Sequence, residues 1–255
     1  MNSGRGSFAY SQARLQARLG QAPEPADLQR AHSARDLASF LAAVRTTSQR
    51  RYAARLAPAM DPHELERHLR HEWSALVEEV TRWQPAPWQA ALRWLRWLPY
   101  LPALQKLVRG GRPPAWTRAD PVLGRIVATD PTLRGAALED TPLQPLRPAL
   151  DAEGDLTAAW LEHWRTLWPE RGDAAQGLES VTHHVALLDA ALRRAPPGGD
   201  SRELQRGLAR RLLRIFRRNP LSPAAAAAYL GLEALGLLDL RGGVMRRAVV
   251  VPGPT

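Results

Sequence analysis

Hydrophobic residues along most of the chain recur every three or four positions, the period that gathers side chains on one face of an α-helix. After Asp61, for example, Leu65, Leu69 and Trp73 follow this period, and the pattern continues to Val80. The chain has no convincing run of alternating apolar and polar residues, so we expect an all-α fold. The predicted helices span residues 7–19, 28–45, 61–80, 88–108, 155–168, 178–194, 201–218 and 224–238.

Several of these helix ends carry capping residues. Asp61 is a good N-cap because Pro62, which follows it, already has the backbone angle of a first helical position. Ser7 is expected to cap the first helix and Gly20 to end it. A glycine pair at residues 110–111 ends the stretch that begins at residue 88, which prolines interrupt near residue 100. Closely spaced prolines between about residues 110 and 155 predict loops and short helices.

The segment 219–249, NPLSPAAAAAYLGLEALGLLDLRGGVMRRAV, predicts two helices. Ser222 caps the first of them, and its apolar run 224–238 would be about 22 Å long, short of the ~30 Å hydrocarbon core of a bilayer. Because Glu233 also interrupts this run, we predict a buried bundle helix whose alanine face admits another helix closely, and not a membrane span. A turn in the Leu-Arg-Gly-Gly sequence at 240–243 would lead into a last basic helix.

Composition narrows the class of protein. A chain of 255 residues is long enough for one large domain with a sizeable core. It contains no cysteine, which excludes disulfide bonds and thiolate chemistry and fits a cytoplasmic location. The first six residues are short and polar, and arginines follow them closely, so we expect no signal peptide. The formal net charge is +10, and all of the 35 basic residues except Lys106 are arginine. Such a charge attracts phosphate groups, anionic lipids or acidic partners, and it equally fits a solvated surface.

Catalytic and metal-binding motifs are not evident. His63 and His68 lie five residues apart, which turns them about 140° away from each other on a helix, whereas a zinc-protease helix needs a spacing of four. His68 and His71 could share a face, but they supply only two ligands. His183 and His184 are adjacent and come with no nucleophile or phosphate-loop motif. We therefore expect no metal site, no cofactor and no enzymatic activity.

A tryptophan stripe at Trp160, Trp164 and Trp168 has two interpretations. Aromatic rings can stack on nucleic-acid bases. At helical spacing they more often pack one helix against another, and we expect packing here.

Arginines recur with the same four-residue spacing at Arg202, Arg206, Arg210 and Arg214, which together are called the arginine face below. An apolar stripe of leucine and isoleucine has the same period in this segment. The pattern is typical of a basic amphipathic helix, which can face phosphate, anionic lipid or an acidic protein, or simply form a solvated outer face.

Both ends of the chain carry residues that resemble the signature of a known family. The C-terminal set is Pro220-Leu221-Ser222, Tyr229, Glu233, Leu240-Arg241 and Met245-Arg246-Arg247. The N-terminal set comprises residues 8–15 (FAYSQARL), 36–41 (DLASFL), Thr46-Thr47, Tyr52 and residues 66–69 (ERHL). In this order they resemble the family of central-stalk connectors that V-type and A-type rotary ATPases share in bacteria, archaea and eukaryotes.

The resemblance implies a short, divergent bacterial member of that family. The fold would be a single helical domain of up to three similar modules, at roughly residues 1–60, 61–200 and 201–255, with the middle module reduced. The modules would form a pseudo-threefold funnel, lined by polar residues, that receives the central shaft. The function would be that of a non-catalytic connector between this shaft and the membrane proteolipid ring. The connector would lie at the cytoplasmic face of the membrane, in an enzyme that couples ion transport to ATP hydrolysis or synthesis.

The candidate contacts to the ring, the shaft and anionic lipid are Tyr229, Glu233, Arg241, Arg246, Arg247, Arg206, Arg210 and Arg214. With this function, nucleic acid is not an expected partner. The alternative is a soluble helical adaptor that uses the same arginine face to bind nucleic acid or to regulate another protein.

Overall fold

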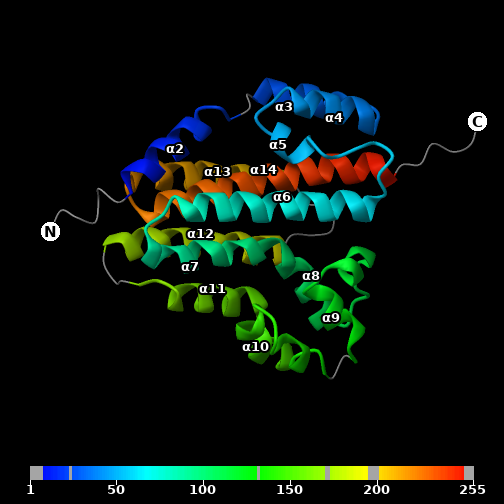
Figure 1. Cartoon of the computed structure of the whole chain (residues 1–255), viewed down its shortest axis with the longest axis vertical. Coiled ribbons are helices and arrows are strands. Elements are labelled where there is room, and N and C mark those ends of the chain that lie inside the picture. Colours follow the sequence, from blue (N-terminus) through cyan, green and yellow to red (C-terminus); the bar gives the residue numbers. More distant parts are fainter. Residues whose placement is uncertain (1–7, 23–24, 131–132, 170–172, 195–200, 250–255) are drawn as a thin grey trace, which may run out of the picture.

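The protein is described by a computed structural model that covers residues 8–22, 25–130, 133–169, 173–194 and 201–249 (Figure 1). Every regular element in these ranges is a helix, and none of them contains a strand. The predicted all-α fold class is thereby confirmed.

The N-terminal region contains α2 (Ala9–Leu19), α3 (Pro25–Ser33), α4 (Leu37–Arg45) and α5 (Arg50–Ala53). One continuous helix over residues 28–45 was expected, and this is wrong, because the chain breaks between α3 and α4. Asp36 begins a new helix there by accepting a hydrogen bond from the backbone nitrogen of Ser39 at 2.8 Å. The predicted cap at Ser7 lies outside the described residues.

The next region follows its capping signals. Helix α6 (Pro62–Arg82) begins with a capping box in which the carboxylate of Asp61 accepts from the backbone nitrogen of Glu64, and Glu64 accepts from that of Asp61. Helices α7 (Ala86–Trp94) and α8 (Leu101–Val108) are joined by the 3-10 helix η1 (Leu95–Tyr100). The predicted interruption near residue 100 is confirmed, because Pro99 lies inside η1.

The proline-rich middle folds into the predicted short helices. They are η2 (Ala115–Ala119), α9 (Leu123–Ala128), η4 (Ala136–Leu138), η5 (Gln144–Leu146) and α10 (Arg147–Asp151). The long helices then resume with α11 (Leu156–Thr166), α12 (Asp173–Arg194) and α13 (Ser201–Arg218).

The C-terminal segment forms one helix, α14 (Pro223–Val249), so the predicted turn and second helix are wrong. The glycine pair serves close packing. Gly243 is buried within α14, and a Cβ at this position would collide with the ring of Phe40 on α4. The absence of a side chain thus allows the two helices to approach, while the backbone keeps its helical hydrogen bonds.

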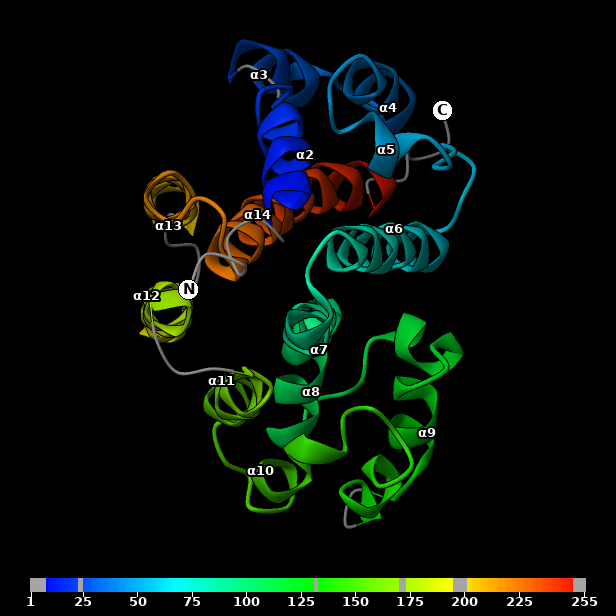
Figure 2. The ribbon, with the colours of Figure 1, turned by 60° about the vertical axis from the view of Figure 1, so that its left-hand side comes forward.

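Helix α14 crosses the centre of the molecule (Figure 2) and contacts α2, α4, α6, α7, α12 and α13. Its first two turns are buried on all sides, with Ala224 to Leu230 each at most 2% exposed. Buried hydrophobic residues from Phe8 to Val244 belong to one continuous core. All three of the predicted segments, 1–60, 61–200 and 201–255, contribute to it.

The length of α14 also corrects the prediction that this segment is too short to span a membrane. At 27 residues α14 is about 40 Å long, so length does not exclude a span. It is the one helix in the described residues that is long and apolar enough to cross a membrane, with a mean hydropathy of 1.3. The core helix of a soluble protein passes the same test, and 56% of the apolar window is buried inside this fold.

Candidate functional site

The polar residues of α14 make their main contacts inside the protein. The Arg241 Nε atom donates to the carboxylate of Glu66 on α6 at 2.6 Å. Arg70 donates to the other carboxylate oxygen at 2.8 Å, and its guanidinium lies 3.7 Å from the ring centre of Trp116. The side chains of Glu66 and Arg70 are only 4% and 12% exposed, whereas that of Arg241 is 45% exposed. Glu66 is therefore a buried carboxylate held between one buried and one half-exposed arginine.

Glu233 lies one turn beyond Tyr229 on α14 and accepts a hydrogen bond from the Tyr52 hydroxyl at 2.8 Å. Tyr52 and Tyr229 are 1% and 2% exposed. Burial, followed by the negative charge of Glu233, raises the pKa of both phenols, so each keeps its proton. Tyr52 therefore supplies a neutral donor that ties α5 to α14.

Arg247 fastens the C-terminal part of α14 to the turn between α3 and α4. Its Nη2 atom donates to the backbone oxygens of His32 at 2.8 Å and Ala34 at 2.7 Å. Its guanidinium also stacks on the ring of Phe40, 4.3 Å from the centre. Arg246, by contrast, makes no such contact in the described residues and is exposed.

The predicted interface residues therefore fall into two groups. Tyr229, Glu233, Arg241 and Arg247 bind other helices of the same chain, while Arg246 and the arginines of α13 face solvent. Arg241 and the second group are exposed to a partner, whereas Tyr229 is buried and Glu233 and Arg247 are partly buried. The interface role of both groups stays a prediction.

The arginine face lies on the outside of α13. The side chains of Arg206 and Arg210 are 66% and 71% exposed and pair with Glu203, and Arg214 is also exposed. The side chain of Arg202 lies outside the described residues. The opposite side of the helix packs into the core through Leu208, Leu212, Ile215 and Phe216. Because its apolar side is already buried, α13 can offer a partner charge but no apolar surface.

The tryptophan stripe is a packing element, as expected. Trp160 and Trp164 are each 1% exposed, and the indole nitrogen of Trp164 donates to the Ala91 carbonyl at 2.8 Å. Among the described residues, no group of three or more histidine or acidic side chains is placed to hold a metal ion.

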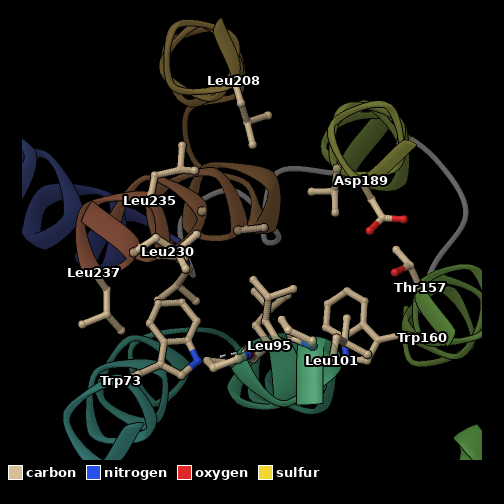
Figure 3. A pocket seen from close by; sticks show the side chains of 18 of the residues that line it. Trp73, Leu95, Leu101, Thr157, Trp160, Asp189, Leu208, Leu230, Leu235 and Leu237 are labelled. Carbon is tan, nitrogen blue, oxygen red and sulfur yellow. Dashed lines mark hydrogen bonds between the residues drawn. The ribbon is translucent and has the colours of Figure 1, made fainter. Parts of the chain in front are cut away.

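An apolar cavity of about 310 Å³ lies between α6, η1, α8, α11, α12, α13 and α14 (Figure 3). Trp73 and Trp160 stand in its wall together with leucines from α13 and α14. Leu238, which is 51% exposed, and Arg241 also line it, so the cavity reaches the surface at this point. Its lining is mostly apolar, unlike the polar funnel that the resemblance implies.

This cavity was not foreseen from the sequence. Its lining residues come from elements that are far apart along the chain, and the apolar ones each have the local pattern of an ordinary core position. The ion pair between Glu66 and Arg70 could have been predicted from the sequence, because the two residues are four positions apart on one helix.

Comparison with known proteins adds no relative. The chain matches no model of a known protein family, and no curated protein matches it.

Proposed function

We propose that this protein is the non-catalytic connector of a V-type or A-type rotary ATPase and joins the central shaft to the membrane proteolipid ring. The observation that supports the proposal most strongly is the packing of the two end regions on each other. Residues that carry the N-terminal part of the resemblance contact those that carry the C-terminal part, in the pairs Tyr52 with Glu233, Glu66 with Arg241 and Phe40 with Arg247.

In this proposal the segments 1–60, 61–200 and 201–255 correspond to the three helical modules of the family, and the middle one is reduced. The connector passes torque by shape and by many modest contacts, with no bond chemistry. A rigid helix that is tied at several points to its neighbours, as α14 is by Glu66, Tyr52 and the turn after α3, suits this task.

The protein would lie at the cytoplasmic face of the membrane. Arg246 and the arginine face would contact anionic lipid head groups and the acidic loop ends of ring and shaft proteins, since exposed guanidinium groups bind both.

Co-purification tests the proposal. We expect a tagged chain, isolated from detergent-solubilised membranes of its host, to bring down the proteolipid ring and the shaft proteins, identified by mass spectrometry. Reversal of charge at Arg206, Arg210 and Arg214 to glutamate should reduce their yield about tenfold, as the loss of roughly 1.4 kcal/mol of binding free energy would.

A matched control reverses three arginines elsewhere. Arg109, Arg112 and Arg118 are also exposed, and no ion pair holds them in the described part of the chain. Their reversal should leave co-purification unchanged. Absence of ring and shaft proteins from the unaltered sample would refute the connector function.

The second candidate, a nucleic-acid-binding adaptor, rests on the exposed arginine face alone. It predicts that the chain binds a short DNA duplex and that log K falls against the logarithm of the salt concentration. The expected slope is about −0.9 per phosphate neutralised, or about −3 for three arginines. Fluorescence anisotropy at several salt concentrations measures this slope. The adaptor function requires that the reversal of Arg206, Arg210 and Arg214 abolishes the slope, and it fails if the unaltered chain shows none.

A further inference from the structure

The cavity described above has the size and lining of a small-molecule site. Its volume of about 310 Å³ is at the lower end of the roughly 300–1,000 Å³ that is usual for such pockets. Apolar residues, chiefly leucines and tryptophans, form most of its wall. Two arginines, Arg70 and Arg241, and two carboxylates, Glu66 and Asp189, also line it, so their formal charges cancel. A neutral, mostly apolar occupant fits this lining better than an ion does.

One buried hydrogen-bond donor in the wall stands out. Trp160 is 1% exposed, yet its indole nitrogen has no partner among the described residues. The two other tryptophans of the wall are satisfied. Trp73 donates to the Leu95 carbonyl at 3.3 Å, as the dashed line in Figure 3 shows, and Trp164 donates to the Ala91 carbonyl at 2.8 Å. Buried donors in proteins are nearly always paired. Of the two tryptophans whose indole nitrogen has no partner in the described structure, Trp160 and Trp168, Trp160 is the one that lines the cavity.

Water is a poor candidate for the acceptor of Trp160. A buried water molecule normally needs about two to four polar partners. Of the polar side chains in the wall beside Trp160, Gln105 donates to Thr157 at 2.7 Å, so both already have a partner. An organic molecule with a single oxygen satisfies the indole and fills the apolar volume at the same time.

We propose that this cavity binds a neutral, largely apolar molecule with a carbonyl or hydroxyl oxygen that accepts a hydrogen bond from the indole nitrogen of Trp160. The molecule enters beside Leu238 and Arg241, where the cavity meets the surface. This inference rests on the cavity alone and is independent of the connector function.

Two small probes of similar shape test the proposal. Butyrophenone is a neutral aromatic ketone, and butylbenzene lacks its oxygen. We expect isothermal titration calorimetry of the purified chain to show binding of both, with the ketone about tenfold tighter, as one hydrogen bond worth about 1.4 kcal/mol would make it. Trp160→Phe should remove this preference and leave the affinity for butylbenzene unchanged.

The matched control is Trp168→Phe. Trp168 also has an indole nitrogen without a partner in the described structure, but it does not line the cavity. Its replacement should leave both affinities as they are. A second variant, Ala234→Leu, adds volume inside the cavity and should weaken both probes at least tenfold.

Three results would contradict the proposed binding site. The proposal is overturned if the unaltered chain binds neither probe, as it would if a segment of a partner protein were the natural occupant. Undiminished binding in Ala234→Leu also overturns it, as does a ketone preference that survives Trp160→Phe. If Trp160→Phe fails to fold, the Ala234→Leu variant and the preference for the ketone over butylbenzene decide in its place.

Discussion

Removal of the charge of Glu66 should destabilise the protein far more than removal of the charge of Arg241, although the two residues form the same ion pair. Glu66 is 4% exposed and holds both Arg70 and Arg241. The variant Glu66→Gln keeps the shape of the side chain and leaves the buried guanidinium of Arg70 without its counter-charge. Burial lowers the pKa of Arg70 and the charge of Glu66 opposes that shift, which indicates how much this arginine depends on its partner.

The magnitude follows from burial. Loss of one partner of a buried ion pair costs about 3–5 kcal/mol, because the other charge stays buried and uncompensated. Arg70 keeps its hydrogen bond to the Pro99 carbonyl at 2.6 Å and its stacking on Trp116, so we expect the lower end, about 3 kcal/mol. Arg241 is 45% exposed and can turn to water, so Arg241→Gln should cost only about 0.5–1 kcal/mol.

Urea unfolding at pH 7, followed by tryptophan fluorescence, measures both changes. With a slope of about 3 kcal/mol per molar urea, Glu66→Gln should lower the midpoint by about 1 M and Arg241→Gln by about 0.3 M or less. Glu72→Gln on the same helix is the control, because Glu72 meets the exposed Arg55 only at 4.0 Å and its loss should change the midpoint little. If Arg241→Gln proves as costly as Glu66→Gln, the reasoning from burial is refuted.

Two further predictions concern helix packing and pH. Gly243→Ala should destabilise the protein by about 1–3 kcal/mol because its methyl group would collide with Phe40. The control Gly207→Ala has no atom within 4 Å of the new Cβ and should stabilise the protein by about 0.5–1 kcal/mol through helix propensity. Thermal melting compares the two variants, and a stabilising Gly243→Ala would contradict the close approach of α14 to Phe40. Burial opposes the ionisation of Glu79, but the charge and hydrogen bond of Arg18 outweigh it and hold the pKa of this carboxyl below its usual range. Its contribution to stability is therefore present above the unfolded pKa of about 4.3 and is lost as the pH falls through the folded pKa. The melting temperature of Glu79→Gln should thus fall less between pH 6 and pH 3 than that of the unaltered chain, and an equal fall would show that this pair does not contribute.

Local sequence signals predicted several of the helices well. Asp61 and Pro62 begin α6, Asp155 begins α11, and the period of α13 buries its leucines and exposes its arginines, all as expected. These features depend on neighbours within one or two turns, so the sequence contains the information they need.

Glycine was the main source of error. The pair at 242–243 was interpreted as a turn because glycine often ends helices. In the structure the reason for Gly243 is Phe40, about 200 positions away in the sequence, whose ring occupies the space of the missing side chain. The length argument against a membrane span failed with it, and only the burial of the helix by its neighbours places α14 in the core.

The sequence by itself determined the all-helical class, most helix boundaries and the charged face of α13, because these follow from the period and capping of short segments. The tertiary structure alone decided that Glu66 is shared between two arginines, that Tyr229 and Glu233 face inward, and that helices from distant segments enclose a cavity around Trp160. The physical reason is that a side chain's burial, the partner of a charge and an enclosed volume are properties of pairs and groups of helices. They come into being only when those helices pack.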